Sequence, residues 1–210
     1  MIKAAPTKFG RWFWRTFTKL SISRQFASFT YDPLEEWDTE QAILMIGNHI
    51  SWWDGFWPLA LNEAKFHKNY HVMMLERELS KRPFMRRGGA FSIHPGTRGI
   101  VESFDYAAKL LQAPENLVLM YPQGAIHSLY EQQITFHPGL KRLLRHSPGF
   151  QLIGFVATVD YFSQPKPQVH LYLKRFDHTE IQDLPTLNNA YQDFFDSSLA
   201  LQKQKSPAHN

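Results

Sequence analysis

The sequence has no cysteine among its 210 residues. This absence excludes disulfides, thiolate metal ligands and a cysteine nucleophile, and it fits a reducing compartment. An uninterrupted apolar stretch of the roughly 18 residues that a membrane-spanning helix requires is also missing. Near the N-terminus, Lys8, Arg11, Arg15 and Lys19 interrupt the segment where an apolar signal core would lie. We therefore expect a cytoplasmic protein that does not span the membrane.

Apolar residues make up 43% of the chain, so a folded core is expected, and its length suits one domain over residues 1–210. The formal net charge of +4 favours an anionic partner, such as a lipid surface or a phosphorylated cofactor. The chain shows no nucleic-acid recognition motif, and we predict no nucleic-acid partner. We expect a monomer.

Residues 1–30 contain a predicted amphipathic helix from Lys8 to Ser21. At about 100° per residue, one arc of roughly 140° is apolar and the neighbouring arc is basic. The apolar arc holds Phe9, Trp12, Phe13, Phe17 and Leu20; the basic arc holds Lys8, Arg11, Arg15 and Lys19; Trp14 lies off both. This pattern of an apolar arc beside a basic arc is typical of a helix that lies on an anionic membrane surface. The alternative is an ordinary amphipathic helix packed on its own domain.

Beyond this helix, apolar runs of strand length alternate with helix-like stretches. Strands are predicted at 42–46, 71–75, 90–93, 117–121, 152–161 and 169–176, and helices near Ser51 and at 99–112, 140–146 and 187–202. The segment 76–87 is predicted to be helical or irregular. This alternation predicts a single α/β domain with a mixed, largely buried sheet flanked by helices. We expect a catalytic core at 42–176 and a frayed tail at 203–210.

The strongest chemical signal is Asn48-His49-Ile50-Ser51-Trp52-Trp53-Asp54, directly after the first predicted strand. On one straight helix, His49 and Asp54 would lie about 140° apart and could not meet. They can meet if His49 lies on the turn and Asp54 in the first helical turn. Ser51 and Asp54 also have the spacing of a capping box, so capping alone is a competing explanation. Two ligands are too few for a metal site, and we predict none. His67 and His71 are interpreted as incidental residues of a polar segment.

This stretch resembles the first signature block of the glycerolphosphate and lysophospholipid acyltransferase family. Three further blocks of that family follow in order: 88–94 (Gly-Gly-Ala-Phe-Ser-Ile-His), 121–125 (Tyr-Pro-Gln-Gly-Ala) and 136–140 (Phe-His-Pro-Gly-Leu). The resemblance covers roughly residues 42–161. It implies transfer of a fatty acyl group from an acyl thioester, carried by CoA or acyl carrier protein, to a hydroxyl of a lysolipid or other lipid alcohol. No other cofactor is implied.

The chain departs from the family pattern where an acceptor phosphate would be held. The second block usually ends in Arg, and here His94 stands there, with Arg98 four residues on as a potential substitute. The third block usually has Glu followed after Gly by Thr-Arg, and here Gln123 is followed after Gly124 by Ala and Ile126. A further block of the family lies on the predicted strand 152–161, and Gly154 stands there in place of the usual proline. These departures predict an acceptor without a phosphate monoester.

The resemblance and the chemistry assign His49 as a general base and Asp54 as the partner that holds its tautomer. Substrate contacts are expected from Asn48, Ser51, His94, Arg98, Gln123 and Gly124. Backbone N–H groups at 123–124 are candidates for stabilising the oxyanion. A peripheral site on the cytoplasmic face of the membrane follows from the basic helix. Two alternatives stay open: a lipid-binding or acyl-carrier-binding module without turnover, and a thioester hydrolase.

Overall fold

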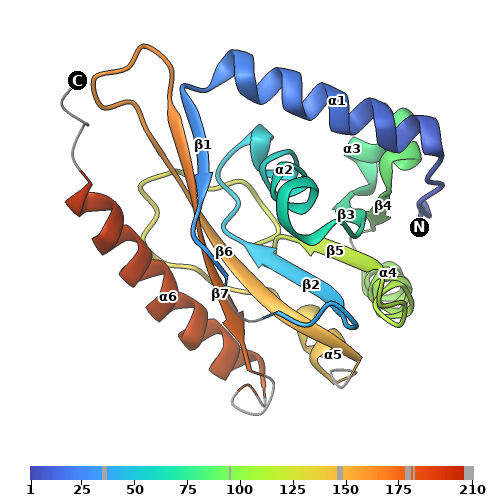
Figure 1. Ribbon diagram of the computed structural model, residues 1–210. Coiled ribbons are helices and arrows are strands. Elements are labelled where there is room, and N and C mark those ends of the chain that lie inside the picture. Colours follow the sequence, from blue (N-terminus) through green and yellow to red (C-terminus); the bar gives the residue numbers. More distant parts are fainter. Residues whose placement is uncertain (35–36, 95, 146–148, 178–180, 182, 206–210) are drawn as a thin grey trace.

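A single seven-stranded sheet organises the chain (Figure 1). The computed structural model describes residues 1–34, 37–94, 96–145, 149–177, 181 and 183–205. The strands are β1 (Ser28–Tyr31), β2 (Ala42–Gly47), β3 (Asn69–Leu75), β4 (Ala90–Ile93), β5 (Asn116–Met120), β6 (Phe150–Asp160) and β7 (Gln168–Phe176). Their order across the sheet is β1-β7-β6-β2-β5-β3-β4.

Strands β6, β2, β5, β3 and β4 run parallel, and β7 turns back antiparallel to β6. The edge strand β1 pairs parallel with β7. From β2 the chain moves outward to β3 and β4, returns to β5 between β2 and β3, and then crosses to β6 on the other side of β2. Ligand sites of such sheets lie where the winding direction reverses, at the carboxyl ends of the strands. That point is the end of β2 and β5.

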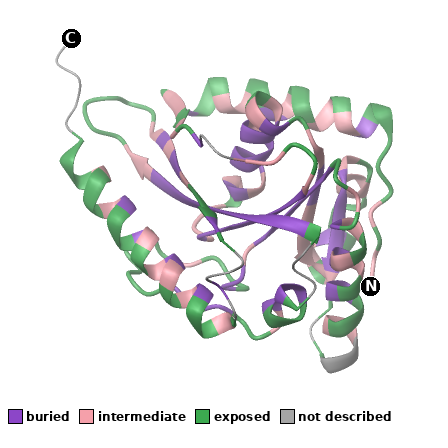
Figure 2. Ribbon diagram, turned by 60° about the horizontal axis from the view of Figure 1, so that its bottom comes forward, coloured by how far each residue is buried: buried purple, intermediate pink, exposed green. Residues whose placement is uncertain are grey.

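Helices cover both faces of the sheet. They are α1 (Lys8–Gln25), the 3₁₀ turn η1 (Trp52–Gly55), α2 (Trp57–Leu61) with a π turn η2 (Asn62–Phe66), α3 (Glu76–Lys81), a 3₁₀ segment η3 (Pro83–Gly88), α4 (Thr97–Leu110), α5 (Leu140–Leu144) and α6 (Leu184–Gln204). Side chains of α1 and α2 pack on one face, and those of α4, α5 and α6 on the other. The strands are therefore buried between two layers of helices whose outer sides are exposed (Figure 2).

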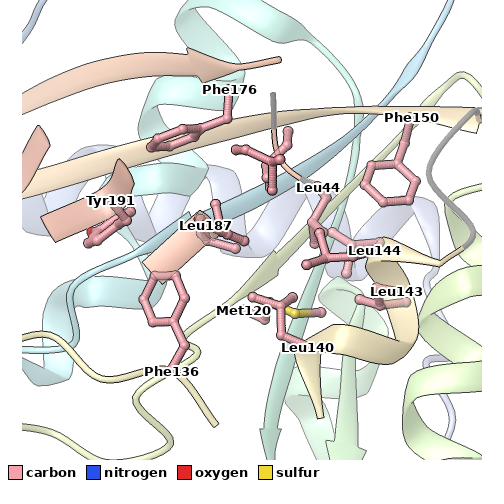
Figure 3. Close-up of a cluster of buried hydrophobic side chains, with 14 of the residues drawn as sticks. Leu44, Met120, Phe136, Leu140, Leu143, Leu144, Phe150, Phe176, Leu187 and Tyr191 are labelled. Atoms are coloured by element: carbon pink, nitrogen blue, oxygen red, sulfur yellow. The ribbon is translucent and has the colours of Figure 1, made fainter. Parts of the chain in front are cut away.

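The second strand shows how the sequence produces this arrangement. Side chains of a strand alternate between faces. Ala42, Leu44 and Ile46 enter the core under α4, α5 and α6, part of which is drawn in Figure 3. Ile43 and Met45 enter the core under α1 and α2. Because both faces are covered, the strand is a continuous apolar run without alternating polar residues.

The predicted α/β class and the flanked, buried sheet are confirmed, with several local corrections. Strand β1 was not predicted, and the segment after Ser51 begins as a 3₁₀ turn. The interpretation of His71 as an incidental polar residue is wrong: it lies buried in β3, and burial, reinforced by the charge of Arg11, lowers its pKa to about 4. The predicted closing helix extends to Gln204, and most of the predicted frayed tail lies outside the described residues.

Helix α1 packs on the domain through a face centred outside both predicted arcs, although Phe13 and Phe17 of the apolar arc also contact Phe84 and Phe56. Gly10 and Thr18 are buried, and Trp14, which lies off both arcs, contacts the core between them. Arg11 turns inward and donates to the side chain of Asn69, so it does not belong to the exposed basic face. Within the part of the chain that the structure describes, no helix is both long and apolar enough to cross a membrane.

Candidate active site

The turn that leaves β2 is fixed by close contacts with β6. Only glycine fits at position 47, because a Cβ on Gly47 would lie 2.1 Å from Cζ of Phe155. The next residue, Asn48, is buried, and its side-chain amide pairs with the backbone of Ala157: it donates to the carbonyl at 3.0 Å and accepts from the N–H at 2.8 Å. These bonds hold the start of the turn, and a substrate contact by Asn48 stays a prediction.

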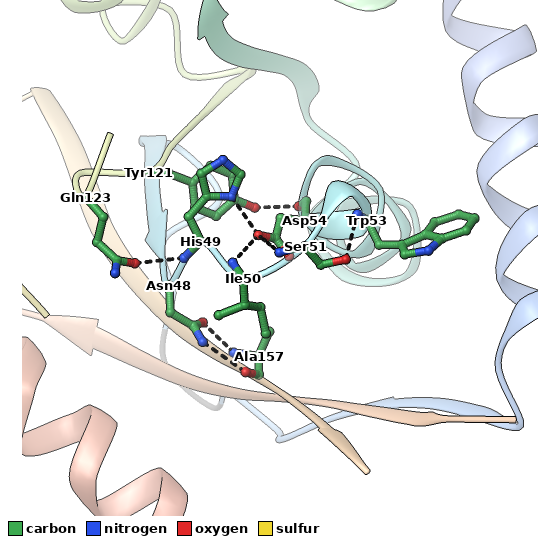
Figure 4. A network of polar contacts seen from close by, with 9 residues as sticks. All are labelled: Asn48, His49, Ile50, Ser51, Trp53, Asp54, Tyr121, Gln123 and Ala157. Atoms are coloured by element: carbon green, nitrogen blue, oxygen red, sulfur yellow. Dashed lines mark hydrogen bonds and ion pairs between the residues drawn. The ribbon is translucent and has the colours of Figure 1, made fainter. Parts of the chain in front are cut away.

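His49 and Asp54 meet, as the spacing required (Figure 4). His49 Nδ1 lies 2.7 Å from Asp54 Oδ2. The same oxygen accepts the backbone N–H groups of Ile50 at 2.6 Å and Ser51 at 2.9 Å. An oxygen that already accepts two N–H groups can only accept from the imidazole, so Nδ1 carries the hydrogen. Nε2 is then the basic nitrogen, and 24% of the imidazole side chain is exposed.

The Asp54 carboxylate is almost completely buried, with 1% of its surface exposed. Burial raises the pKa of Asp54, whereas the hydrogen bonds from His49, Ser51 and Ile50 lower it. Its second oxygen, Oδ1, is buried without a hydrogen-bond partner among the described residues. All of its hydrogen bonding is therefore directed at the turn that carries His49.

Two buried phenols hold the backbone of the turn that carries Asp54. Tyr121 follows β5 and donates to the carbonyl of Asp54 at 2.5 Å, and Tyr70 of β3 donates to the carbonyl of Gly55 at 2.8 Å. Burial, reinforced by the charge of Asp54, raises the pKa of both phenols well above 10, so both remain donors. The ring of Tyr121 also stacks on the imidazole of His49, with centroids 4.4 Å apart and planes 18° apart.

The remaining predicted residues of the first and third blocks serve the turns themselves. Gln123 is buried, and its Oε1 accepts the backbone N–H of His49 at 2.8 Å. The N–H of Gly124 donates to the carbonyl of Tyr121, so that group is not free to stabilise an oxyanion, contrary to our expectation. Ser51 Oγ accepts the backbone N–H of Trp53 and caps η1.

The second block lies farther along the same edge of the sheet. His94 follows β4, which is three strand positions from β2, or roughly 14 Å at the usual strand spacing. Beside it, Glu76 follows β3 and accepts from Ser92 Oγ at 2.7 Å. That hydrogen bond lowers the pKa of Glu76, so its carboxylate is ionised at neutral pH. The side chain of Arg98 lies outside the described part of the structure.

An apolar cleft of about 320 Å³ adjoins the turn 48–55, which carries His49 and Asp54. Its walls include Phe26 at the end of α1, Ile50 of the turn, Leu129 of the loop after β5, and Tyr161 at the end of β6. The sequence did not indicate this cleft, nor the roles of Tyr70 and Tyr121, because they arise from contacts between distant segments. Among the described residues, no group of three or more metal-ligating His, Asp or Glu side chains is present.

Comparison with known proteins agrees with this geometry. Residues 28–158 match the family model described as Acyltransferase. A crystal structure of PlsC from Thermotoga maritima, a 1-acyl-sn-glycerophosphate (LPA) acyltransferase, has a similar fold, with a TM-score of 0.65 and 12% sequence identity. That match covers 91% of this chain and 79% of the PlsC chain. No curated protein sequence matches the chain.

An α/β fold with a histidine and a carboxylate paired at the switch point thus coincides with a family match over most of the chain. The chain belongs to the acyltransferase family, and it is an acyltransferase.

Proposed function

We propose that this acyltransferase moves a fatty acyl group from an acyl thioester of CoA or acyl carrier protein to a hydroxyl of a lysolipid or other lipid alcohol. The observation that supports this most strongly is the 2.7 Å contact between His49 and the buried carboxylate of Asp54. A hydroxyl is a poor nucleophile at neutral pH, so a base must remove its proton as it attacks. We propose that the enzyme acts as a monomer.

The proposed reaction needs one base and one good leaving group. The acceptor oxygen attacks the thioester carbonyl while its proton moves to Nε2 of His49, and Asp54 stabilises the imidazolium that forms. The tetrahedral intermediate then collapses, the C–S bond breaks, and the departing sulfur receives the proton from the imidazolium. The products are an ester and a free thiol. Tyr121, stacked on the imidazole, also favours the positive charge through its ring face.

We further propose that the acceptor lacks a phosphate monoester. The family's position for a phosphate-binding arginine holds His94, and Glu76 places an ionised carboxylate beside it. A phosphate dianion is best held by arginine in bidentate geometry. Neither His94 nor Glu76, whose carboxylate lies 3.5 Å from the N-terminal ammonium of Met1, offers such a contact. A lysolipid with a larger or uncharged head group, or a non-glycerol lipid alcohol, fits this site better.

Helix α1 is proposed to attach the enzyme to the cytoplasmic face of the membrane. Packing through Gly10 and Thr18 leaves Phe9, Trp12 and Leu20 exposed, with 58%, 59% and 47% of their surfaces accessible. The cations of α1 lie on its exposed sides, except Arg11, and the helix has no acidic residue. Aromatic side chains beside cations suit an anionic lipid surface.

A radiolabelled acyl thioester, offered with a panel of lipid acceptors, tests the activity. Acylated lipid is the expected product. Release of free fatty acid would instead indicate a thioester hydrolase, and no consumption of the thioester would indicate a binding module. A competition between lysophosphatidic acid and neutral lysolipids tests the acceptor, repeated with Arg98→Gln. A strong preference for lysophosphatidic acid that disappears with Arg98→Gln would contradict the proposed acceptor class.

A further inference from the structure

The exposed large hydrophobic side chains of this protein are not scattered. Apart from Val101 on α4 and Leu201 on α6, those of the described residues lie on four segments. These segments are α1, the turn 48–55 with Trp52, the loop 126–130 after β5, and the tip of the β6–β7 hairpin at 161–162. Contiguous exposed apolar surface on a soluble domain marks an interaction site.

All four segments meet around the cleft beside the turn 48–55. One wall residue comes from each: Phe26 directly after α1, Ile50, Leu129 and Tyr161. Backbone hydrogen bonds of 2.8 Å tie the loop and the hairpin to their neighbours. In the loop, the N–H of His127 donates to the carbonyl of His49. At the end of α1, the N–H of Ala27 donates to the carbonyl of Pro167 in the hairpin. Figure 1 shows the hairpin tip beside the C-terminal end of α1.

The loop and the hairpin tip present aromatic rings to solvent. Tyr130 is 89% exposed and Phe162 is 37% exposed, and the backbone of Phe162 has a φ of 46°, which residues other than glycine rarely adopt. Lys166 of the hairpin and Arg24 of α1 add exposed cations. The carboxylate of Glu131, beside Tyr130, is held by its own loop, where it accepts the backbone N–H groups of the two residues that follow it.

We propose that the loop 126–130 and the hairpin tip 161–162 form a second contact with the same lipid bilayer that α1 binds. This inference rests on the proposed membrane attachment. Tyrosine and tryptophan rings favour the interface between water and lipid, and two projecting tips flanked by cations suit a deformable anionic surface. The cleft, whose wall includes Ile50 next to His49, then faces the bilayer, so a lipid alcohol can approach the turn that carries His49 without leaving the membrane.

The absence of cysteine allows a direct test, because one introduced cysteine gives one labelled position. Tyr130→Cys and Phe162→Cys carry an environment-sensitive fluorophore at the two tips, Trp12→Cys reports on α1, and Val101→Cys is a matched exposed control on α4. With vesicles of phosphatidylcholine and phosphatidylglycerol, labels at 12, 130 and 162 should shift to blue emission, and the label at 101 should not.

The outcomes separate this inference from the functions on which it rests. A response at 12 alone would show that α1 is the whole contact and would overturn the inference. No emission shift at any labelled position would refute the membrane attachment itself. Acyl transfer to a water-soluble acceptor, measured on the same labelled proteins, reports the chemistry independently of both.

A second measurement uses serine substitutions. Tyr130→Ser with Phe162→Ser should weaken partition into these vesicles by roughly tenfold, because two rings lose their apolar contact. Val101→Ser should leave partition unchanged. Turnover of the soluble acceptor should be preserved in both variants, and unchanged partition of the double variant would contradict the second contact.

Discussion

The substitution Asp54→Asn tests how the carboxylate acts on His49. Asp54 Oδ2 accepts from His49 Nδ1 and from the backbone N–H groups of Ile50 and Ser51. Because two backbone donors point at this position, the carbonyl oxygen of an asparagine should occupy it, with the NH₂ group at the place of Oδ1. His49 Nδ1–H then keeps an acceptor, and the reactive tautomer is retained. The variant should lose the charge and keep the geometry.

The magnitude follows from that loss. A unit-charge pair about 4 Å apart gains about 4 kcal/mol at the effective dielectric of 20 that suits protein sites. A neutral carbonyl dipole recovers part of this gain, which leaves the barrier roughly 3 kcal/mol higher. The rate of acyl transfer should therefore fall by about 10²–10³-fold. This is less than the roughly 10⁴-fold loss in protease triads, where asparagine enforces the wrong tautomer.

Two measurements check this reasoning. Turnover with saturating thioester and lipid gives the rate, and ¹⁵N chemical shifts of the His49 imidazole report which nitrogen carries the hydrogen. Asp54→Ala is the comparison, because it removes the acceptor of both backbone N–H groups and should be as inactive as His49→Ala. An asparagine variant with hydrogen on Nε2, or one no more active than Asp54→Ala, would refute the proposed anchoring. Wild-type turnover would show that the charge has no role.

Three further predictions concern the base, the helix and the core. His49→Ala should abolish transfer and leave the thermal unfolding temperature nearly unchanged, because the imidazole fills little core volume. Changing Lys8 and Lys19 to Gln should weaken binding to anionic vesicles in a flotation assay by roughly 1 kcal/mol per charge. Arg15→Gln should have a smaller effect because Arg15 is paired with Glu63. No loss in the lysine variant would show that α1 serves packing alone. Because the pKa of His71 is about 4 in the folded state against 6.5 unfolded, stability is complete above pH 6.5 and falls by up to about 3 kcal/mol towards pH 4. Urea unfolding at both pH values should show this fall, and His71→Asn should reduce it.

The elements that could be predicted are those whose signal is local. A continuous apolar run such as Ala42–Ile46, ended by polar residues, indicates a buried strand whatever lies beside it. Strand β1 could not be recognised because Ser28–Tyr31 is short and lies at the sheet edge, where burial is incomplete. The antiparallel turn from β6 to β7 and the insertion of β5 between β2 and β3 depend on pairing between distant segments, which spacing along the chain does not encode.

The orientation of α1 shows a second limit. Hydrophobic periodicity identified a helix with an apolar arc, but shape complementarity selected a different face for packing. A Cβ added to Gly10 would lie 2.3 Å from the carbonyl oxygen of Arg87, so the helix approaches η3 where its side chain is smallest. In the sequence, the small residues Gly10 and Thr18, four positions before and after Trp14, were the available indication of this packing face. This packing leaves Phe9, Trp12 and Leu20 of the apolar arc exposed, which is why it is compatible with the proposed membrane binding.

At Asp54 the capping role and the proposed catalytic role do not conflict. The sequence presented them as competing explanations, because Ser51 and Asp54 have capping spacing while His49 and Asp54 can form a catalytic pair. In the structure one oxygen does both: Oδ2 accepts the N–H groups that a cap satisfies and also the Nδ1–H of His49. The cap bonds fix the carboxylate, and Tyr121 fixes the carbonyl of the same residue. A carboxylate held in this way loses little entropy when it orients the imidazole, so in the proposed reaction the capping geometry would contribute to making His49 an effective base.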